Sequence, residues 1–145
     1  MTLSGAELWL PMPELQEFDE LPRPLSVQCA SLGGPPAGTH LCTLSELRDG
    51  NAVRLEFNQG QRVRRIFIVA TADGCAAYVN ACPHFNIPLN FGKGTFLNYT
   101  GERLLCVHHC ARFRIDDGYC DAGPCAGHWL TPVAVQLEGD DVYAA

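Results

Sequence analysis

The sequence contains no long apolar run. None of its segments approaches the roughly 18 consecutive apolar residues that a membrane helix requires, so we expect no membrane span. The N-terminus also lacks the basic start and apolar core of a secretory signal. From these two absences we expect a cytoplasmic location.

Positive charge is also scarce, because 10 Lys and Arg residues stand against 16 Asp and Glu residues, which gives a net charge of −6. An acidic chain repels nucleic-acid phosphates, so we expect no nucleic-acid partner. Most of the excess negative charge lies in residues 1–38, which hold one Arg and five acidic residues. The remainder of the chain is close to neutral.

Internal repeats are absent, and no helical period is convincing after residue 50. Apolar and alternating runs instead predict short strands, separated by turns such as Asn58-Gln59-Gly60, Ala72-Asp73-Gly74, Thr100-Gly101 and Asp116-Asp117-Gly118. The predicted strands are 52–57, 64–70, 76–80, 96–98, 103–107, 111–115, 133–137 and 142–144. The pattern predicts an all-β fold of small stacked antiparallel sheets.

The first 38 residues differ from the rest. They hold six of the ten prolines, together with most of the excess acid, and proline disfavours both helices and sheet ladders. We interpret residues 1–38 as a Pro-rich, acidic and mostly irregular N-terminal extension. Residues 39–145, with the predicted strands, form a single domain large enough to bury its own core.

Two short motifs carry the chemistry. Cys82-Pro83-His84 is followed, after 21 intervening residues, by Cys106-Val107-His108-His109. Thiolate and imidazole ligands suit either zinc or a two-iron cluster in which two His replace two Cys on one iron. Spacing alone does not choose between these metals, nor between His108 and His109, because Cys106-Val107-His108 is itself a Cys-x-His motif.

The residues around the motifs extend the pattern. Pro88-Leu89 follows the first motif, Phe113 lies four residues past His109, and Gly123-Pro124 lies downstream. Leu44-Ser45-Glu46-Leu47, followed by Gly50, precedes both motifs and forms an entry segment. Together these features of residues 39–145 resemble the Rieske 2Fe-2S family, of the soluble, low-potential ferredoxin type.

The resemblance implies a Rieske-type fold with a cluster-binding subdomain at one tip and one 2Fe-2S cluster. The implied ligands are Cys82, His84, Cys106 and His109, and His108 would then lie at a docking face. High-potential members carry Ser and Tyr hydroxyls where this chain has Ala111 and Phe113. They also link their two loops by a disulfide between positions that are Ile87 and His108 here.

Because those hydroxyls and that disulfide are missing, we expect the reduction potential of the cluster to lie near the low end of the Rieske range, which spans about −150 to +300 mV. The resemblance further implies a carrier of single electrons that is not an enzyme by itself. Its implied partners are a flavin- and NADH-dependent reductase and a terminal oxygenase of aromatic rings, or another redox protein. The alternatives are a non-catalytic Rieske-like small subunit, as in nitrite reductase, a redox sensor, or a zinc domain.

Six further cysteines remain, namely Cys29, Cys42, Cys75, Cys110, Cys120 and Cys125. A free cysteine behaves as a small hydrophobic residue, and we expect most of the six to fill the core in this way. The sequence does not decide whether Cys110 forms a disulfide with Cys120 or with Cys125.

Overall fold

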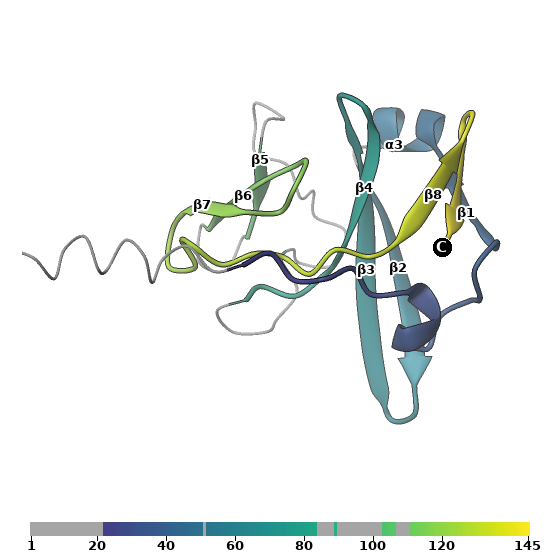
Figure 1. Ribbon diagram of the computed structural model, residues 1–145, viewed down its shortest axis with the longest axis horizontal. Coiled ribbons are helices and arrows are strands. Elements are labelled where there is room, and N and C mark those ends of the chain that lie inside the picture. The colour runs from purple at the N-terminus through teal and green to yellow at the C-terminus, as the bar shows by residue number, and fades with distance from the viewer. Residues whose placement is uncertain (1–21, 51, 84–88, 90–102, 107–110) are drawn as a thin grey trace, which may run out of the picture.

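The computed structural model describes residues 22–50, 52–83, 89, 103–106 and 111–145 (Figure 1). His84, Ile87, His108, His109 and Cys110 lie outside these residues, as do the predicted strand 96–98 and the turn at residues 100–101. Among the helices of the described part of the chain, none has the length and hydropathy needed to cross a bilayer.

The central sheet consists of strands β2 (Ala52–Gln59), β3 (Arg62–Thr71) and β4 (Gly74–Val79), paired antiparallel in that order. All three strands were predicted. However, β2 and β3 extend further toward their turn, because Gln59 pairs with Arg62 around a two-residue connection in which Gly60 has a φ of 64°. A hairpin this tight requires positive φ, which glycine adopts without strain.

Both faces of strand β3 are buried. Phe67 and Val69 point into one hydrophobic cluster, and Ile66 and Ile68, which alternate with them, point into a second. Because successive side chains leave a strand on opposite faces, the continuous apolar run in β3 reflects cover on both sides of the sheet.

The second cluster is covered by strands β1 (His40–Thr43), β8 (Val135–Glu138) and β9 (Asp141–Ala144), which pair in the order β1-β9-β8. The predicted strands at 133–137 and 142–144 are thereby confirmed. Helix α3 (Leu44–Gly50) begins at a capping box, in which Thr43 Oγ1 accepts from the Glu46 N–H and Glu46 Oε1 accepts from the Thr43 N–H.

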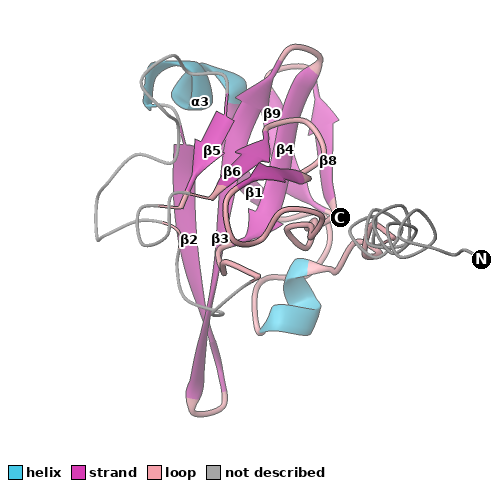
Figure 2. Ribbon diagram, turned by 90° about the vertical axis from the view of Figure 1, so that its left-hand side faces the viewer, coloured by secondary structure: helices cyan, strands magenta, loops and turns pink. Residues whose placement is uncertain are grey.

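The first cluster is covered by a small sheet of strands β5 (Arg103–Leu105), β6 (Arg112–Arg114) and β7 (Cys120–Ala122). This sheet lies on the opposite side of the central sheet from β1, β8 and α3 (Figure 1), and seen from its own side it lies in front of the central sheet (Figure 2). The Tyr78 hydroxyl in β4 joins the two sheets by donating to the Ile115 carbonyl at 2.7 Å.

Residues 22–38, the described part of the predicted N-terminal extension, pack on the rest of the chain. Its backbone is irregular, as predicted, apart from a short 3-10 helix, η1 (Cys29–Leu32). Burial of Cys29 in the second cluster was expected, but two further contacts were not: Val27 forms a bridge to Val133, and Leu32 is buried in the same cluster. Proline and glycine prevent regular structure in this segment but do not prevent burial of its apolar residues.

We therefore predict that Leu32→Ala lowers the free energy of unfolding by about 3 kcal/mol, because the Leu32 side chain is 3% exposed. Leu25→Ala is the matched control, since Leu25 lies in the same segment and is 89% exposed, and its effect should stay within about 0.5 kcal/mol. Denaturant unfolding measures both variants. Equal effects would show that the segment does not contribute to the core.

Candidate metal centre

The first motif loop starts where β4 ends. Asn80, which is 6% exposed, is held by its N–H donating to the Arg65 carbonyl at 2.8 Å. Its side-chain Oδ1 accepts a hydrogen bond of 2.8 Å from the N–H of Leu89, which is fully buried. Asn80 thus ties Leu89 back to the end of β4 and anchors both ends of the segment that contains the first motif.

The second motif loop leaves β5 at Cys106 and returns to β6 at Ala111. The Cys106 N–H donates to the Ala111 carbonyl at 2.9 Å. This bond closes the segment between the two residues at its base. Cys106 and Ala111 are both fully buried, so the start and the end of the second motif are anchored in the core.

A third loop, residues 123–128, packs against the second. Gly123 has a φ of 99°, and a Cβ at this position would lie 2.6 Å from the Ala111 Cα. Only glycine allows this close backbone approach. This contact sets the start of the third loop against Ala111, the last residue of the second motif loop.

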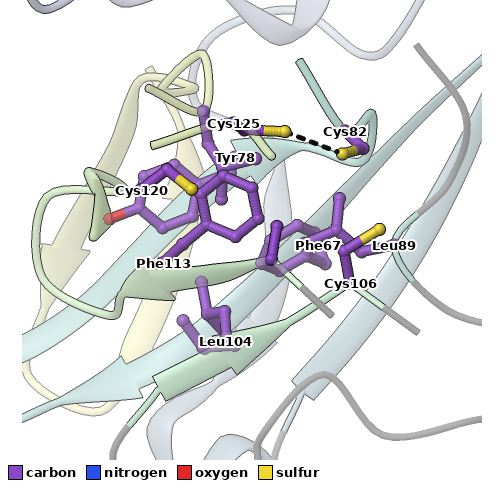
Figure 3. Close-up of a cluster of buried hydrophobic side chains, with 12 residues drawn as sticks. Phe67, Tyr78, Cys82, Leu89, Leu104, Cys106, Phe113, Cys120 and Cys125 are labelled. Atoms are coloured by element: carbon purple, nitrogen blue, oxygen red, sulfur yellow. Dashed lines mark hydrogen bonds between the residues drawn. The ribbon is translucent and has the colours of Figure 1, made fainter. Parts of the chain in front are cut away.

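The two motif cysteines meet in one buried cluster. Cys82 and Cys106 are both 0% exposed and belong to the hydrophobic cluster beneath the β5-β6-β7 sheet, with Phe67, Tyr78 and Phe113 (Figure 3). The described residues contain no group of three or more potential metal ligands, and the two predicted imidazole ligands lie outside them. Two buried thiols, one from each motif loop, fit the cysteine half of the donor set that a two-iron cluster needs.

Hydroxyl donors are absent at the two positions singled out from the sequence. Ala111 and Phe113 are fully buried in the same cluster as Cys82 and Cys106. Neither side chain can donate a hydrogen bond. The nearby Tyr78 hydroxyl is directed to the Ile115 carbonyl instead.

Most of the remaining cysteines are buried, as expected. Burial raises the pKa of the Cys29, Cys75 and Cys120 thiols, and burial together with the nearby Cys75 and Glu46 raises that of Cys42 to about 11. These groups are therefore protonated and poorly reactive near neutral pH. Among the described residues, neither Cys120 nor Cys125 forms a disulfide bond, and Cys110, the partner considered from the sequence, lies outside them.

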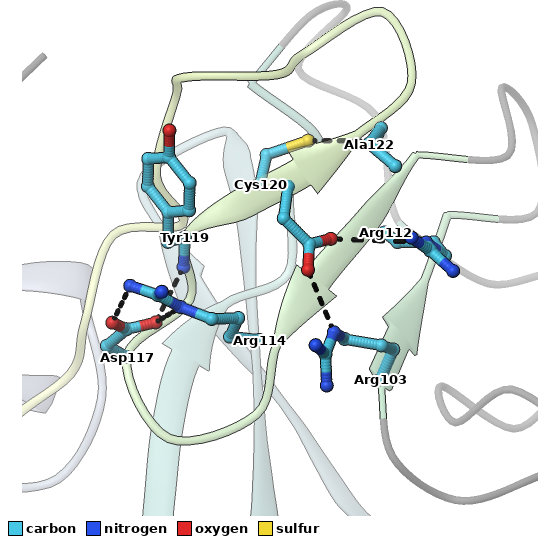
Figure 4. A network of polar contacts seen from close by, with 8 residues as sticks. Arg103, Arg112, Arg114, Asp117, Tyr119, Cys120 and Ala122 are labelled. Carbon is cyan, nitrogen blue, oxygen red and sulfur yellow. Dashed lines mark hydrogen bonds and ion pairs between the residues drawn. The ribbon is translucent and has the colours of Figure 1, made fainter. Parts of the chain in front are cut away.

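Ion pairs brace the turn between β6 and β7 (Figure 4). Arg114 pairs with Asp117, whose Oδ1 also accepts from the Tyr119 N–H at 3.0 Å. Burial alone would raise the pKa of Asp117, but these two hydrogen bonds and the charges of Arg114 and Arg23 outweigh it and lower that pKa. Across the same sheet, Arg103 Nε donates to Asp121 at 3.0 Å.

Sequence reasoning missed two residues at this centre. Asn80 immediately precedes the first motif, and its tendency to bond backbone groups in turns was the available signal. Cys125 was treated only as a core residue or a disulfide partner, whereas its Sγ lies 3.4 Å from that of Cys82. A local sequence pattern cannot predict a contact between residues that are 43 positions apart.

We predict that Gly123→Ala lowers both the iron content per chain and the melting temperature. Its Cβ would overlap the Ala111 backbone, so the third loop must move off the second. Gly38→Ala is the matched control, because Gly38 has a similar φ of 92° with nothing within 4 Å of an added Cβ. Gly38→Ala should lower the free energy of unfolding only by the backbone strain, about 1 to 2 kcal/mol, and should keep its iron. Equal iron loss in both variants would contradict the packing role.

Comparison with known proteins identifies a family for the segment that contains both motif cysteines. The Rieske [2Fe-2S] domain family matches residues 38–136. No protein of curated function matches the chain.

Several solved structures share the fold. The ferredoxin of carbazole 1,9a-dioxygenase from Nocardioides aromaticivorans IC177 is 23% identical with a TM-score of 0.54, covering 74% of this chain and 98% of that one. The Sphingomonas yanoikuyae B1 ferredoxin is 23% identical with a TM-score of 0.53, covering 72% and 94%. A putative nitrite reductase NADPH small subunit is 16% identical with a TM-score of 0.51, covering 77% and 99%.

These likenesses confirm the predicted Rieske-type, nearly all-β fold. With the family match over residues 38–136 and two motif cysteines buried together, the chain belongs to the Rieske [2Fe-2S] domain family, and its cofactor is one Rieske-type 2Fe-2S cluster.

Proposed function

We propose that the protein is a ferredoxin that carries single electrons in the cytoplasm from a flavin- and NADH-dependent reductase to a terminal oxygenase. It catalyses no reaction on a substrate by itself. The observation that carries this proposal is the burial of Cys82 and Cys106, at 0% exposure, in one hydrophobic cluster. A dry thiolate environment controls solvent access to a redox centre and thereby its potential.

The proposed ligands are Cys82 and Cys106 for one iron and His84 and His109 for the other. When bound, the cluster supplies a one-electron couple. The chain itself buries the two thiolates and excludes water from them. It also fixes the loop backbones through Asn80 and through the hydrogen bond between Cys106 and Ala111.

A low potential fits the apolar positions Ala111 and Phe113. Hydrogen bonds to the sulfurs of a cluster favour the reduced form, because reduction adds negative charge, so missing donors lower the potential. A low potential suits delivery of electrons to an oxygenase. It does not suit acceptance of electrons from a quinol.

Oxygenase partnership is supported by the structural neighbours. One of them is a complex of reduced oxygenase and oxidised ferredoxin in carbazole 1,9a-dioxygenase, whose matched chain is 22% identical with a TM-score of 0.55. The second candidate function is a small subunit of a nitrite reductase, which the match to the putative NADPH small subunit favours. Both functions use the same buried thiols and differ in the protein that accepts the electron.

The function is tested by anaerobic electron transfer, with the reductase and oxygenase of a carbazole dioxygenase system as probes. We expect one NADH to reduce two chains through the reductase, since NADH gives up two electrons. We then expect oxidised oxygenase to reoxidise the chains. Visible absorption follows both steps. Reoxidation by a nitrite reductase catalytic subunit but not by the oxygenase would support the second function and contradict the first.

The ligand assignment is tested by paired histidine variants. His109→Ala should abolish binding of two irons, because one iron loses an imidazole, whereas His108→Ala should keep both iron content and electron paramagnetic resonance signal. Iron analysis and spectra of the reduced proteins check this. The reverse result would assign His108 as the ligand.

A further inference from the structure

We propose that Cys125 donates a hydrogen bond to the sulfur of Cys82 and so raises the reduction potential of the centre. Cys125 would thus be a positioning and tuning residue, not a ligand. This inference rests on the proposed function, in which Cys82 binds iron.

Distance and burial define the contact. The two Sγ atoms lie 3.4 Å apart, within hydrogen-bond range for sulfur, and face each other inside the cluster (Figure 3). Cys82 is 0% exposed and Cys125 is 1% exposed. Water therefore does not compete for this contact, and a hydrogen bond is electrostatically stronger in such a low-dielectric interior.

Chemistry fixes the direction of the hydrogen bond. The geometry alone allows either sulfur to be the donor. A cysteine that coordinates a metal has lost its proton, so Cys82 can only accept, and the proton of the pair belongs to Cys125. A thiol is a weak donor, but hydrogen bonds to a charged acceptor are stronger than those between neutral groups.

The backbone of the third loop holds Cys125 in place. The Ala126 N–H donates to the Gly123 carbonyl at 3.2 Å, and the His128 N–H donates to the Cys125 carbonyl at 2.8 Å. The Gly127 N–H closes the loop onto the Cys120 carbonyl at 3.0 Å. Since Gly123 also packs on Ala111, the fold sets the backbone position from which the Cys125 side chain reaches Cys82.

The Cys125 hydrogen bond should raise the reduction potential, because reduction adds negative charge to the cluster. Ala111 and Phe113 leave the centre without hydroxyl donors at the positions compared above, and Cys125 supplies a donor from a different loop. A donor directed at a ligand sulfur stabilises the added electron. The potential of this chain should therefore lie above that of a variant lacking the Cys125 thiol.

The test compares holoprotein variants by mediated redox titration. At the midpoint potential of the unchanged protein, Cys125→Ala should lower the ratio of reduced to oxidised cluster about threefold, the size expected for one modest hydrogen bond. Cys125→Ser keeps a donor and should stay nearer to the unchanged protein than Cys125→Ala does. Cys120→Ala is the matched control, because Cys120 is a buried thiol of the same cluster whose Sγ bonds to the Ala122 carbonyl at 3.2 Å, and its ratio should not change.

A second readout does not depend on the potential. The infrared S–H band lost on Cys125→Ala should lie at a lower frequency than that of an unbonded thiol. An unchanged potential in Cys125→Ala, an equal fall in Cys120→Ala, or a failure of both Cys125 variants to take up iron would overturn the inference. Iron analysis and paramagnetic resonance of the unchanged protein separate these outcomes from a failure of the proposed function, because that failure would leave the unchanged protein without a Rieske cluster.

Discussion

Burial of both faces of the β2-β3-β4 sheet is the constraint on which the rest of the structure depends. Ile66 and Ile68 require cover from β1, β9, α3 and the segment around Leu32, whereas Phe67 and Val69 require cover from the β5-β6-β7 sheet. The cover of Phe67 and Val69 also brings Cys106 and Ala111, which flank strands β5 and β6, into the same cluster. A small sheet of short strands becomes stable because it packs on the longer strands of the central sheet, and Cys106 and Ala111, the ends of its first loop, are buried between them.

The described ends of both motif loops and the 123–128 loop lie at that junction, and a specific interaction holds each of them. Asn80 closes the first, the Cys106 N–H closes the second, and the close approach of Gly123 to Ala111 sets the third upon the second. The thiols of Cys82, Cys106, Cys120 and Cys125 are buried there in one cluster of apolar side chains. At a buried centre of this kind, solvent access and hydrogen bonds to the ligand sulfurs tune the reduction potential.

The strands of the central sheet and the family could be predicted from the sequence because both depend on local patterns, whereas the short strands β1 and β7 were missed. The apolar run of β3 and the turns around it mark the central hairpins, and the Cys-x-His and Cys-x-x-His motifs with Gly123-Pro124 point to the cofactor. Packing of Val27 and Leu32 could not be predicted, since proline-rich composition reports backbone preference and not burial. The contact between Cys82 and Cys125 depends on the tertiary fold alone.

The central claim is that this chain holds one Rieske cluster with mixed cysteine and histidine ligation. Electron paramagnetic resonance of the dithionite-reduced protein, together with iron and zinc analysis of the same sample, tests it most directly. The account predicts a rhombic signal, with an average g value clearly below that of an all-cysteine cluster, and about two irons per chain. A silent spectrum with one zinc per chain would contradict it, because the motif residues would then hold a structural ion.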